Sequence, residues 1–136
     1  MRYIIVFCLS LFGFVASAQV EKTIHQTYNI EGAQSISIQI KGGEYEIENW
    51  AGNTILIETN IKLEQATTQI LNYVIENGRY EVILENNEGS YILKDKQQQR
   101  NKLRSKTGEC VENIKMKILV PDEFEIQSLT SLVKKQ

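Results

Sequence analysis

A dense run of basic side chains between residues 94 and 106 is the strongest chemical signal in this sequence. Six of its thirteen residues are basic and one is acidic, whereas residues 19–93 carry four basic and eleven acidic side chains. A positive segment on an acidic chain can hold an acidic glycan, lipid headgroups or a negative partner surface. The candidate contacts for such a partner are Lys94, Lys96, Arg100, Lys102, Arg104 and Lys106. The same charges can instead neutralise the acidic half of their own domain. The run has no aromatic residue for base stacking, so it does not predict nucleic-acid binding.

Three glutamates at alternate positions form a second cluster. Glu44, Glu46 and Glu48 share one face of a predicted strand, and Glu58 is expected nearby across a hairpin. Two carboxylates about 5–10 Å apart can hydrolyse glycosides when burial raises the pKa of one of them. Calcium also binds carboxylates, but its loops are rich in aspartate, of which residues 19–136 contain two. These glutamates alternate away from the apolar face, so we expect a solvated strand face that discourages edge-to-edge pairing.

No other pattern predicts catalysis or a metal site. His25 is the single histidine, so a zinc site of several histidines is excluded, and a catalytic triad lacks its Gly-x-Ser-x-Gly turn. We expect His25 to be an exposed surface residue. Trp50 follows a predicted hairpin strand, where its indole could stack on a sugar, but we favour a ring that folds back over the core. We predict no catalytic residue, cofactor or metal.

The first 18 residues have the pattern of a cleavable secretory signal peptide. Arg2 precedes an almost wholly apolar run over residues 3–15, and Ala16-Ser17-Ala18 places small residues where signal peptidase cleaves. The apolar run is shorter than the roughly 20 residues that span a bilayer. Cys8 lies inside this run rather than at its end, which does not fit a lipoprotein signal. We expect cleavage before Gln19 and export to the periplasm, the outer surface or the medium, with no transmembrane segment remaining.

Residues 19–136 are predicted to form one domain. Their length allows one modest core and is too short for two. Cys110 is their only cysteine, so no intramolecular disulfide can form. We expect its thiol to be buried, because free cysteine is among the most buried residue types. The alternative is an exposed thiol that links two molecules.

Period-two alternation predicts that the domain is mostly β. Alternating segments at 35–40, 44–48 and 54–63 are separated by turns at 41–43 and 50–53, and together they predict an antiparallel meander. Other strands are predicted at 22–30, 80–84, 90–93, 111–120 and from residue 124, with a turn at 86–89 and Pro121 ending the longest of them.

Helical spacing replaces this alternation in one place. Apolar residues recur at Ala66, Ile70, Tyr73 and Val74, and Gly78 stands where a helix-ending glycine belongs. The pattern predicts a short helix over about residues 64–76, with a strand from Tyr73 into Tyr80 as the alternative. The basic run is predicted to be a solvated loop. The expected fold is therefore mostly β: an antiparallel meander, a β-sandwich or a solenoid-like sheet with one short helix.

Two segments resemble the adhesin-like domain proteins, a family of β-rich secreted bacterial proteins. In the first, from Gly43 to Thr59, a strand ends in a Trp-containing turn that leads into an apolar strand with an outward glutamate. The second is the Val-Pro element that runs from Val120 to Ile126. The signal ending Ala-Ser-Ala-Gln is similar to those of Bacteroidetes-type bacteria.

The resemblance implies an all-β protein of the cell envelope or exterior and supplies no catalytic residues. Members usually continue after the Val-Pro element into stacked strand repeats similar to a right-handed β-helix. This chain ends ten residues after Ile126, so the resemblance implies a truncated or minimal member. We expect an exported, non-catalytic, envelope-associated binding or structural protein. The alternative is a periplasmic ligand-binding or inhibitor-like module that grips an anionic partner through residues 94–106.

Overall fold

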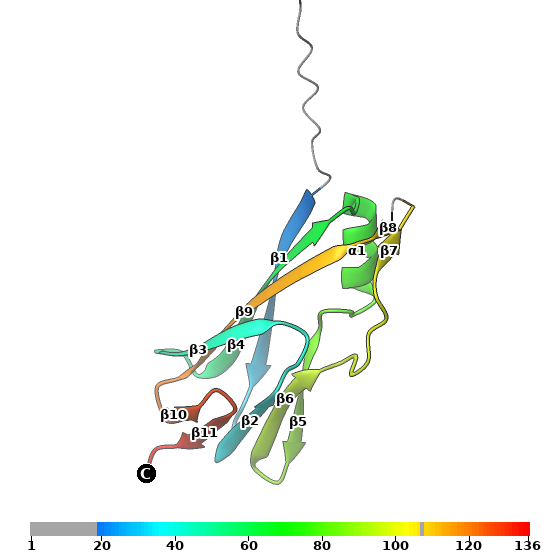
Figure 1. The fold of residues 1–136 in the computed structure, drawn as a ribbon. Coiled ribbons are helices and arrows are strands. Elements are labelled where there is room, and N and C mark those ends of the chain that lie inside the picture. Colours follow the sequence, from blue (N-terminus) through cyan, green and yellow to red (C-terminus); the bar gives the residue numbers. More distant parts are fainter. Residues whose placement is uncertain (1–18, 107) are drawn as a thin grey trace, which may run out of the picture.

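The computed structural model describes residues 19–106 and 108–136 (Figure 1). The predicted signal peptide lies outside these described residues. The described chain is mostly β with one short helix, as predicted, and its strands form two mixed sheets and a two-stranded ribbon. Within the described ranges, no helix is both long enough and apolar enough to cross a membrane.

The two sheets contain four and five strands. In spatial order, the first comprises β1 (Gln19–Asn29), β4 (Thr54–Glu64), β9 (Val111–Pro121) and β3 (Glu44–Trp50). The second comprises β10 (Phe124–Ser128), β11 (Ser131–Lys134), β2 (Ser35–Gln39), β6 (Ser90–Asp95) and β5 (Val82–Asn87). The ribbon pairs β7 (Arg104–Ser105) with β8 (Gly108–Glu109), and the helix is α1 (Thr68–Glu76).

The predicted three-stranded meander is wrong, because β2 lies in the second sheet and β3 and β4 are not neighbours in the first. β2 pairs in parallel with β6, while β3 pairs in parallel with β9, which separates it from β4. Gly42 and Gly43, predicted as a hairpin turn, instead carry the chain from the second sheet to the first. A Cβ on Gly43 would lie 2.9 Å from the Ile114 side chain, so this crossing requires a residue without one.

Apolar side chains of both sheets meet in one core. Its fully buried members include Ile36 and Ile38 of β2, Ile55, Ile57 and Ile61 of β4, Ile118 of β9 and Phe124 of β10. Cys110 is buried as predicted, and its thiol donates to the carbonyl of Gln65 at 3.2 Å. Thr59 of β4 is also buried, and its hydroxyl has no hydrogen-bond partner among the described residues.

The predicted helix is present but begins four residues later than expected. β4 continues to Glu64, because it is paired there with both β1 and β9. Thr67 then caps the helix by accepting a hydrogen bond from the backbone N–H of Ile70 at 3.2 Å. Gly78 follows the helix with φ +76°, as its predicted role requires. The alternative of a strand at residues 73–75 is therefore wrong.

Side-chain amides join the two sheets along both flanks. The amide of Gln26 on β1 donates to the carbonyl of Val82 and accepts from its N–H, at 3.0 and 3.1 Å. On the other flank Asn49 of β3 donates to the carbonyls of Pro121 and Phe124, at 3.1 and 2.9 Å. These bonds satisfy backbone groups at sheet edges and fix the β9–β10 turn beside the end of β3.

The other predicted strands are present with shifted ends. β5 continues through Asn87, so the turn to β6 narrows to Glu88 and Gly89, both with positive φ. Pro121 ends β9 as predicted. The predicted last strand is β10, and the chain then forms one further strand, β11, which the sequence analysis missed.

Candidate functional site

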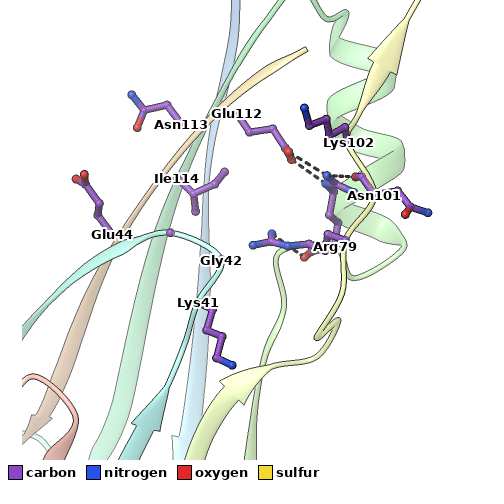
Figure 2. Close-up of a pocket in the computed structure, with 11 residues that line it drawn as sticks. Lys41, Gly42, Glu44, Arg79, Asn101, Lys102, Glu112, Asn113 and Ile114 are labelled. Atoms are coloured by element: carbon purple, nitrogen blue, oxygen red, sulfur yellow. Dashed lines mark hydrogen bonds and ion pairs between the residues drawn. The ribbon is translucent and has the colours of Figure 1, made fainter. Parts of the chain in front are cut away.

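A cleft of about 450 Å³ opens between the β2–β3 connection, the residues after α1 and the chain between β6 and β7 (Figure 2). We call it the basic cleft. Its cationic lining residues are Lys41, Arg79, Arg100 and Lys102, and its acidic ones are Glu44 and Glu112. Its volume is within the range of about 300–1,000 Å³ that small-molecule sites occupy.

Arg79 and Glu112 form one wall of the cleft, and the buried Tyr80 is hydrogen-bonded to this wall from behind. Arg79 donates to both carboxylate oxygens of Glu112, from Nε at 2.7 Å and from Nη2 at 2.9 Å. The hydroxyl of Tyr80, a residue that is only 2% exposed, donates to the same carboxylate at 2.5 Å. A bidentate guanidinium–carboxylate pair of this kind is strong and fixes geometry. It ties the chain after α1 to the start of β9.

The electrostatics of this wall keep Glu112 ionised. Burial alone would raise the pKa of Glu112, but the hydrogen bonds from Arg79 and Tyr80, together with the charges of Arg79 and Arg100, lower it below its ordinary value. The pKa of Arg79 is raised, chiefly by its hydrogen bond to Glu112. Burial and the hydrogen bond to Glu112 raise the pKa of Tyr80. The positive charge of Arg79 is therefore already neutralised inside the protein.

Arg100 presents a second guanidinium, which has no such counter-ion in the described part of the chain. Its Nη1 donates to the carbonyl of Arg79 at 3.2 Å, and its guanidinium carbon lies 5.6 Å from the ring centre of Tyr80. A Cβ on Gly42 would overlap this guanidinium, so the glycine leaves room for it. Among the residues that the structure describes, none forms an ion pair with Arg100. Arg100 also lines the cleft.

Lys41 lines the cleft from the β2–β3 connection. A buried carboxylate at the end of β6 holds this connection, because Asp95 accepts from the backbone N–H groups of Lys41 and Gly42 at 2.7 and 3.2 Å. The Lys41 ammonium is exposed and forms no ion pair within the described part of the chain. Asp95 thus positions Lys41 while its own charge stays inside.

The six basic residues predicted as partner contacts separate into groups. Lys94 pairs with Glu85 at 2.5 Å and Lys96 pairs with Glu81 at 3.1 Å, so these two neutralise the acidic half of the domain. Arg100 and Lys102 line the cleft, where Lys102 also pairs with the exposed Glu109 at 3.3 Å. Arg104 and Lys106 are exposed and lie outside the cleft lining.

The prediction of one solvated loop over residues 94–106 is therefore only partly right. Lys94 and Asp95 belong to β6, and Arg104 and Ser105 form β7. Leu103 packs against the core, so the middle of the run is anchored. Sequence reasoning missed Lys41 and Arg79, which the chain crossing and the glycine after α1 bring to the cleft. A lysine beside Gly42-Gly43 was the one available signal.

The acidic row is a solvated outer face, as predicted, but its expected geometry is wrong. Glu44, Glu46 and Glu48 are exposed on β3. Glu58 does not face them across a hairpin, because β9 lies between, and Lys117 stands opposite both Glu46 and Glu58 in the register. Lys117 also pairs with Glu48 at 3.3 Å. A lysine thus lies where a pair of catalytic carboxylates would need a substrate.

The single histidine is exposed, as predicted. The His25 side chain is 60% exposed, and its Nε2 lies 3.6 Å from a carboxylate oxygen of Glu58 on the neighbouring strand. No group of three or more His, Cys, Asp or Glu residues within 19–106 and 108–136 is arranged to hold a metal ion.

A second hollowed region lies where three turns meet, and we call it the turn end. The turns are Glu31–Gly32 between β1 and β2, residues 51–53 between β3 and β4, and Asp122–Glu123 between β9 and β10. Hollows of about 210 and 400 Å³ share Asn53 and Glu123 in their linings. Figure 1 shows the β3–β4 and β9–β10 turns close to each other, where the N–H of Asp122 donates to the carbonyl of Trp50 at 3.0 Å.

Trp50 lines the smaller hollow and does not fold over the core as predicted. It shares the outer face of β3 with Glu46 and Glu48, and it is not among the side chains packed on the core. The indole covers its own turn instead, since a Cβ on Gly52 would overlap the six-membered ring. The indole N–H donates to the carbonyl of Thr54 at 2.9 Å.

Comparison of this chain with protein families, curated proteins and solved structures finds no match. The basic cleft and the turn end are therefore the features that bear on its function.

Proposed function

We propose that this protein is an exported, non-catalytic binding module of the cell envelope that holds an anionic ligand in the basic cleft. The observation that carries the proposal is Arg100, whose guanidinium lies over Tyr80 and beside Gly42 and forms no ion pair with any described residue. A guanidinium suits carboxylate, sulfate and phosphate groups because its planar donors bind two oxygens at once.

The balance of charge around Arg100 also supports an anion. Arg79 is neutralised by Glu112. The ion pair of Lys102 with Glu109 is exposed, so it contributes little free energy and Lys102 can exchange it for a ligand. Among the described residues of the cleft, Arg100 and Lys41 are then the cations that attract a ligand without such an exchange. An anion between them replaces no internal ion pair, so its binding energy is not offset by a broken contact.

The proposed architecture is a two-sheet sandwich that presents the cleft at one flank. The wall formed by Arg79 and Glu112, with Tyr80 behind it, is rigid because all three side chains are hydrogen-bonded. Such a rigid wall reduces the entropy that a ligand must lose on binding. The signal-peptide pattern and the resemblance to adhesin-like proteins support a place in the envelope.

The test is a binding titration of the purified protein with three anionic probes. These are a galacturonic acid tetramer, a heparin tetrasaccharide, and phosphatidylglycerol vesicles diluted in phosphatidylcholine. We expect at least one to bind, with affinity falling as salt rises from about 50 to about 500 mM. The double variant Lys41→Gln/Arg100→Gln should weaken that binding at least about tenfold, or about 1.4 kcal/mol.

The chain offers a matched control at the other end of the basic run. Lys94→Gln/Lys96→Gln removes the same amount of charge from residues that are paired outside the cleft, so it should change the affinity less than about twofold. Equal losses in both double variants would mean that general charge, not the cleft, binds the probe. Absence of binding to all three probes would overturn the proposal and favour a purely structural role.

A further inference from the structure

The turn end has the features of a second binding site that the basic cleft does not explain. Its two hollows, of about 210 and 400 Å³, adjoin at Asn53 and Glu123. Their size together matches that of small-molecule sites. Turns carried by a rigid scaffold are a common place for binding residues. Here the scaffold is the ends of β1, β3, β4 and β9.

An aromatic ring is held at the edge of this region. The Trp50 indole is kept in place by its hydrogen bond to Thr54 and by the bare backbone of Gly52 beneath it. The ring is partly exposed, lines the smaller hollow, and takes no part in the core. A fixed amphipathic ring gives contact area at little entropic cost, because it has few side-chain torsions to immobilise.

Polar side chains around the ring have no partners of their own among the described residues. Within residues 19–106 and 108–136, the side chains of Asn53, Asp122 and Glu123 form no hydrogen bond or ion pair. The same holds for Glu31 and Lys134, which line the larger hollow. The region thus offers mainly acceptors, with an amide and an ammonium as donors.

We propose that the turn end binds a neutral oligosaccharide, with one sugar ring against Trp50 and its hydroxyls on Asn53, Asp122 and Glu123. The apolar C–H face of a pyranose suits an indole. Its hydroxyls donate to carboxylates and both donate to and accept from an amide. Three carboxylates against one lysine disfavour an anionic ligand. Quaternary ammonium ions favour cages of several aromatic rings, and Trp50 is the single aromatic residue lining the two hollows.

Trp50 is the only tryptophan in the chain, so its fluorescence reports on this site alone. The test is a titration of the purified protein with cellotetraose, maltotetraose and tetra-N-acetylchitotetraose, up to about 20 mM. We expect at least one to change the Trp50 emission saturably, with a dissociation constant of about 0.1–10 mM. Glycerol, which has hydroxyls but no ring face, should produce no saturation.

Variants separate the proposed contacts from the fold. Asn53→Ala and Asp122→Asn should each weaken the response at least about fivefold, about 1 kcal/mol, and Trp50→Phe should weaken binding measured by calorimetry. The cleft variant Lys41→Gln/Arg100→Gln should leave it unchanged, so this inference and the proposed function can fail separately. A saturable change of Trp50 emission with tetramethylammonium but with no sugar would overturn the inference. The absence of a response to any of the three sugars would overturn it as well.

Discussion

The basic cleft and the turn end belong to the same scaffold but satisfy their polar groups in opposite ways. In the cleft, Glu112 accepts three hydrogen bonds from Arg79 and Tyr80. At the turn end, the side chains of Asn53 and Asp122 have no partner among the described residues. One region uses its charges to hold itself together, and the other leaves its polar groups in solvent.

This difference indicates that the cleft wall stabilises the fold, whereas the turn end can adapt to a ligand. A satisfied network in partly buried surroundings rigidifies the wall that carries it. Unpartnered side chains on turns must lose rotamer freedom when they bind, at about 0.5–1.5 kcal/mol each. We therefore expect substitutions of the Arg79, Tyr80 or Glu112 side chains to change stability, and substitutions of the unpartnered polar side chains at the turn end to change binding with little effect on folding.

The largest effect on the free energy of unfolding is expected when Glu112, the acceptor in the cleft wall, loses its charge. Glu112→Gln leaves the Arg79 guanidinium, whose side chain is only 12% exposed, without a counter-ion. We expect a loss of about 2 kcal/mol at pH 7, less than the 3–5 kcal/mol of a fully buried pair because Glu112 is 26% exposed. Urea denaturation measures the loss. The control Glu81→Gln breaks an exposed pair and should cost less than about 0.5 kcal/mol.

The same variant should show a specific dependence on pH. The pKa of Glu112 in the folded protein is below its ordinary value of 4.5, so its contribution is complete above that pH and disappears as pH falls through the folded pKa. The stability difference between wild type and Glu112→Gln should thus be constant from pH 7 to about 5 and shrink below about 4. A difference that persists at low pH would show that the charge of Glu112 is not what stabilises the wall.

A smaller effect on stability should distinguish two glycine-to-alanine substitutions, one in each region. An added Cβ at Gly52 meets the Trp50 ring, which can move only by losing its hydrogen bond to Thr54. An added Cβ at Gly42 meets the flexible end of Arg100 instead. Gly52→Ala should cost about 1–2 kcal/mol and shift the Trp50 emission. Gly42→Ala should cost less than about 0.5 kcal/mol and weaken binding of the anionic probe. Equal costs in thermal melts would contradict this distinction.

The sequence predicted which residues are buried far better than which strands are neighbours. Alternation placed Ile36 and Ile38 inward and Glu44 and Glu46 outward, because burial of one strand face is a local property. Pairing depends on where the chain goes next, and glycines at 42–43 fit a hairpin as well as a crossing between sheets. The buried Ile114 side chain against Gly43, which favours the crossing, lies too far along the chain for local pattern to reveal.

The candidate sites show the same limit. The basic run predicted Arg100 and Lys102 as contacts, but its Lys94 pairs with Glu85 across a β-hairpin. Arg79 is brought to Glu112 by the turn after α1, a contact between residues 33 positions apart. Such contacts depend on tertiary packing, so composition identified the sign of the cleft charge but not which cations remain available.

The last predicted effect uses a core position that lines neither region. Thr59 of β4 lies between Ile24 of β1 and Met116 of β9, and its buried hydroxyl has no hydrogen-bond partner among the described residues. Thr59→Val keeps the β-branched shape and removes the unsatisfied group, so it should raise the free energy of unfolding by about 1 kcal/mol. Urea denaturation checks the gain, and titrations with the anionic and sugar probes should be unchanged. Thr59→Ser keeps the hydroxyl, loses a methyl group and should be destabilising. If Thr59→Val destabilised the protein, the hydroxyl would have a partner such as buried water, and the core around β4 would be less apolar than its side chains indicate.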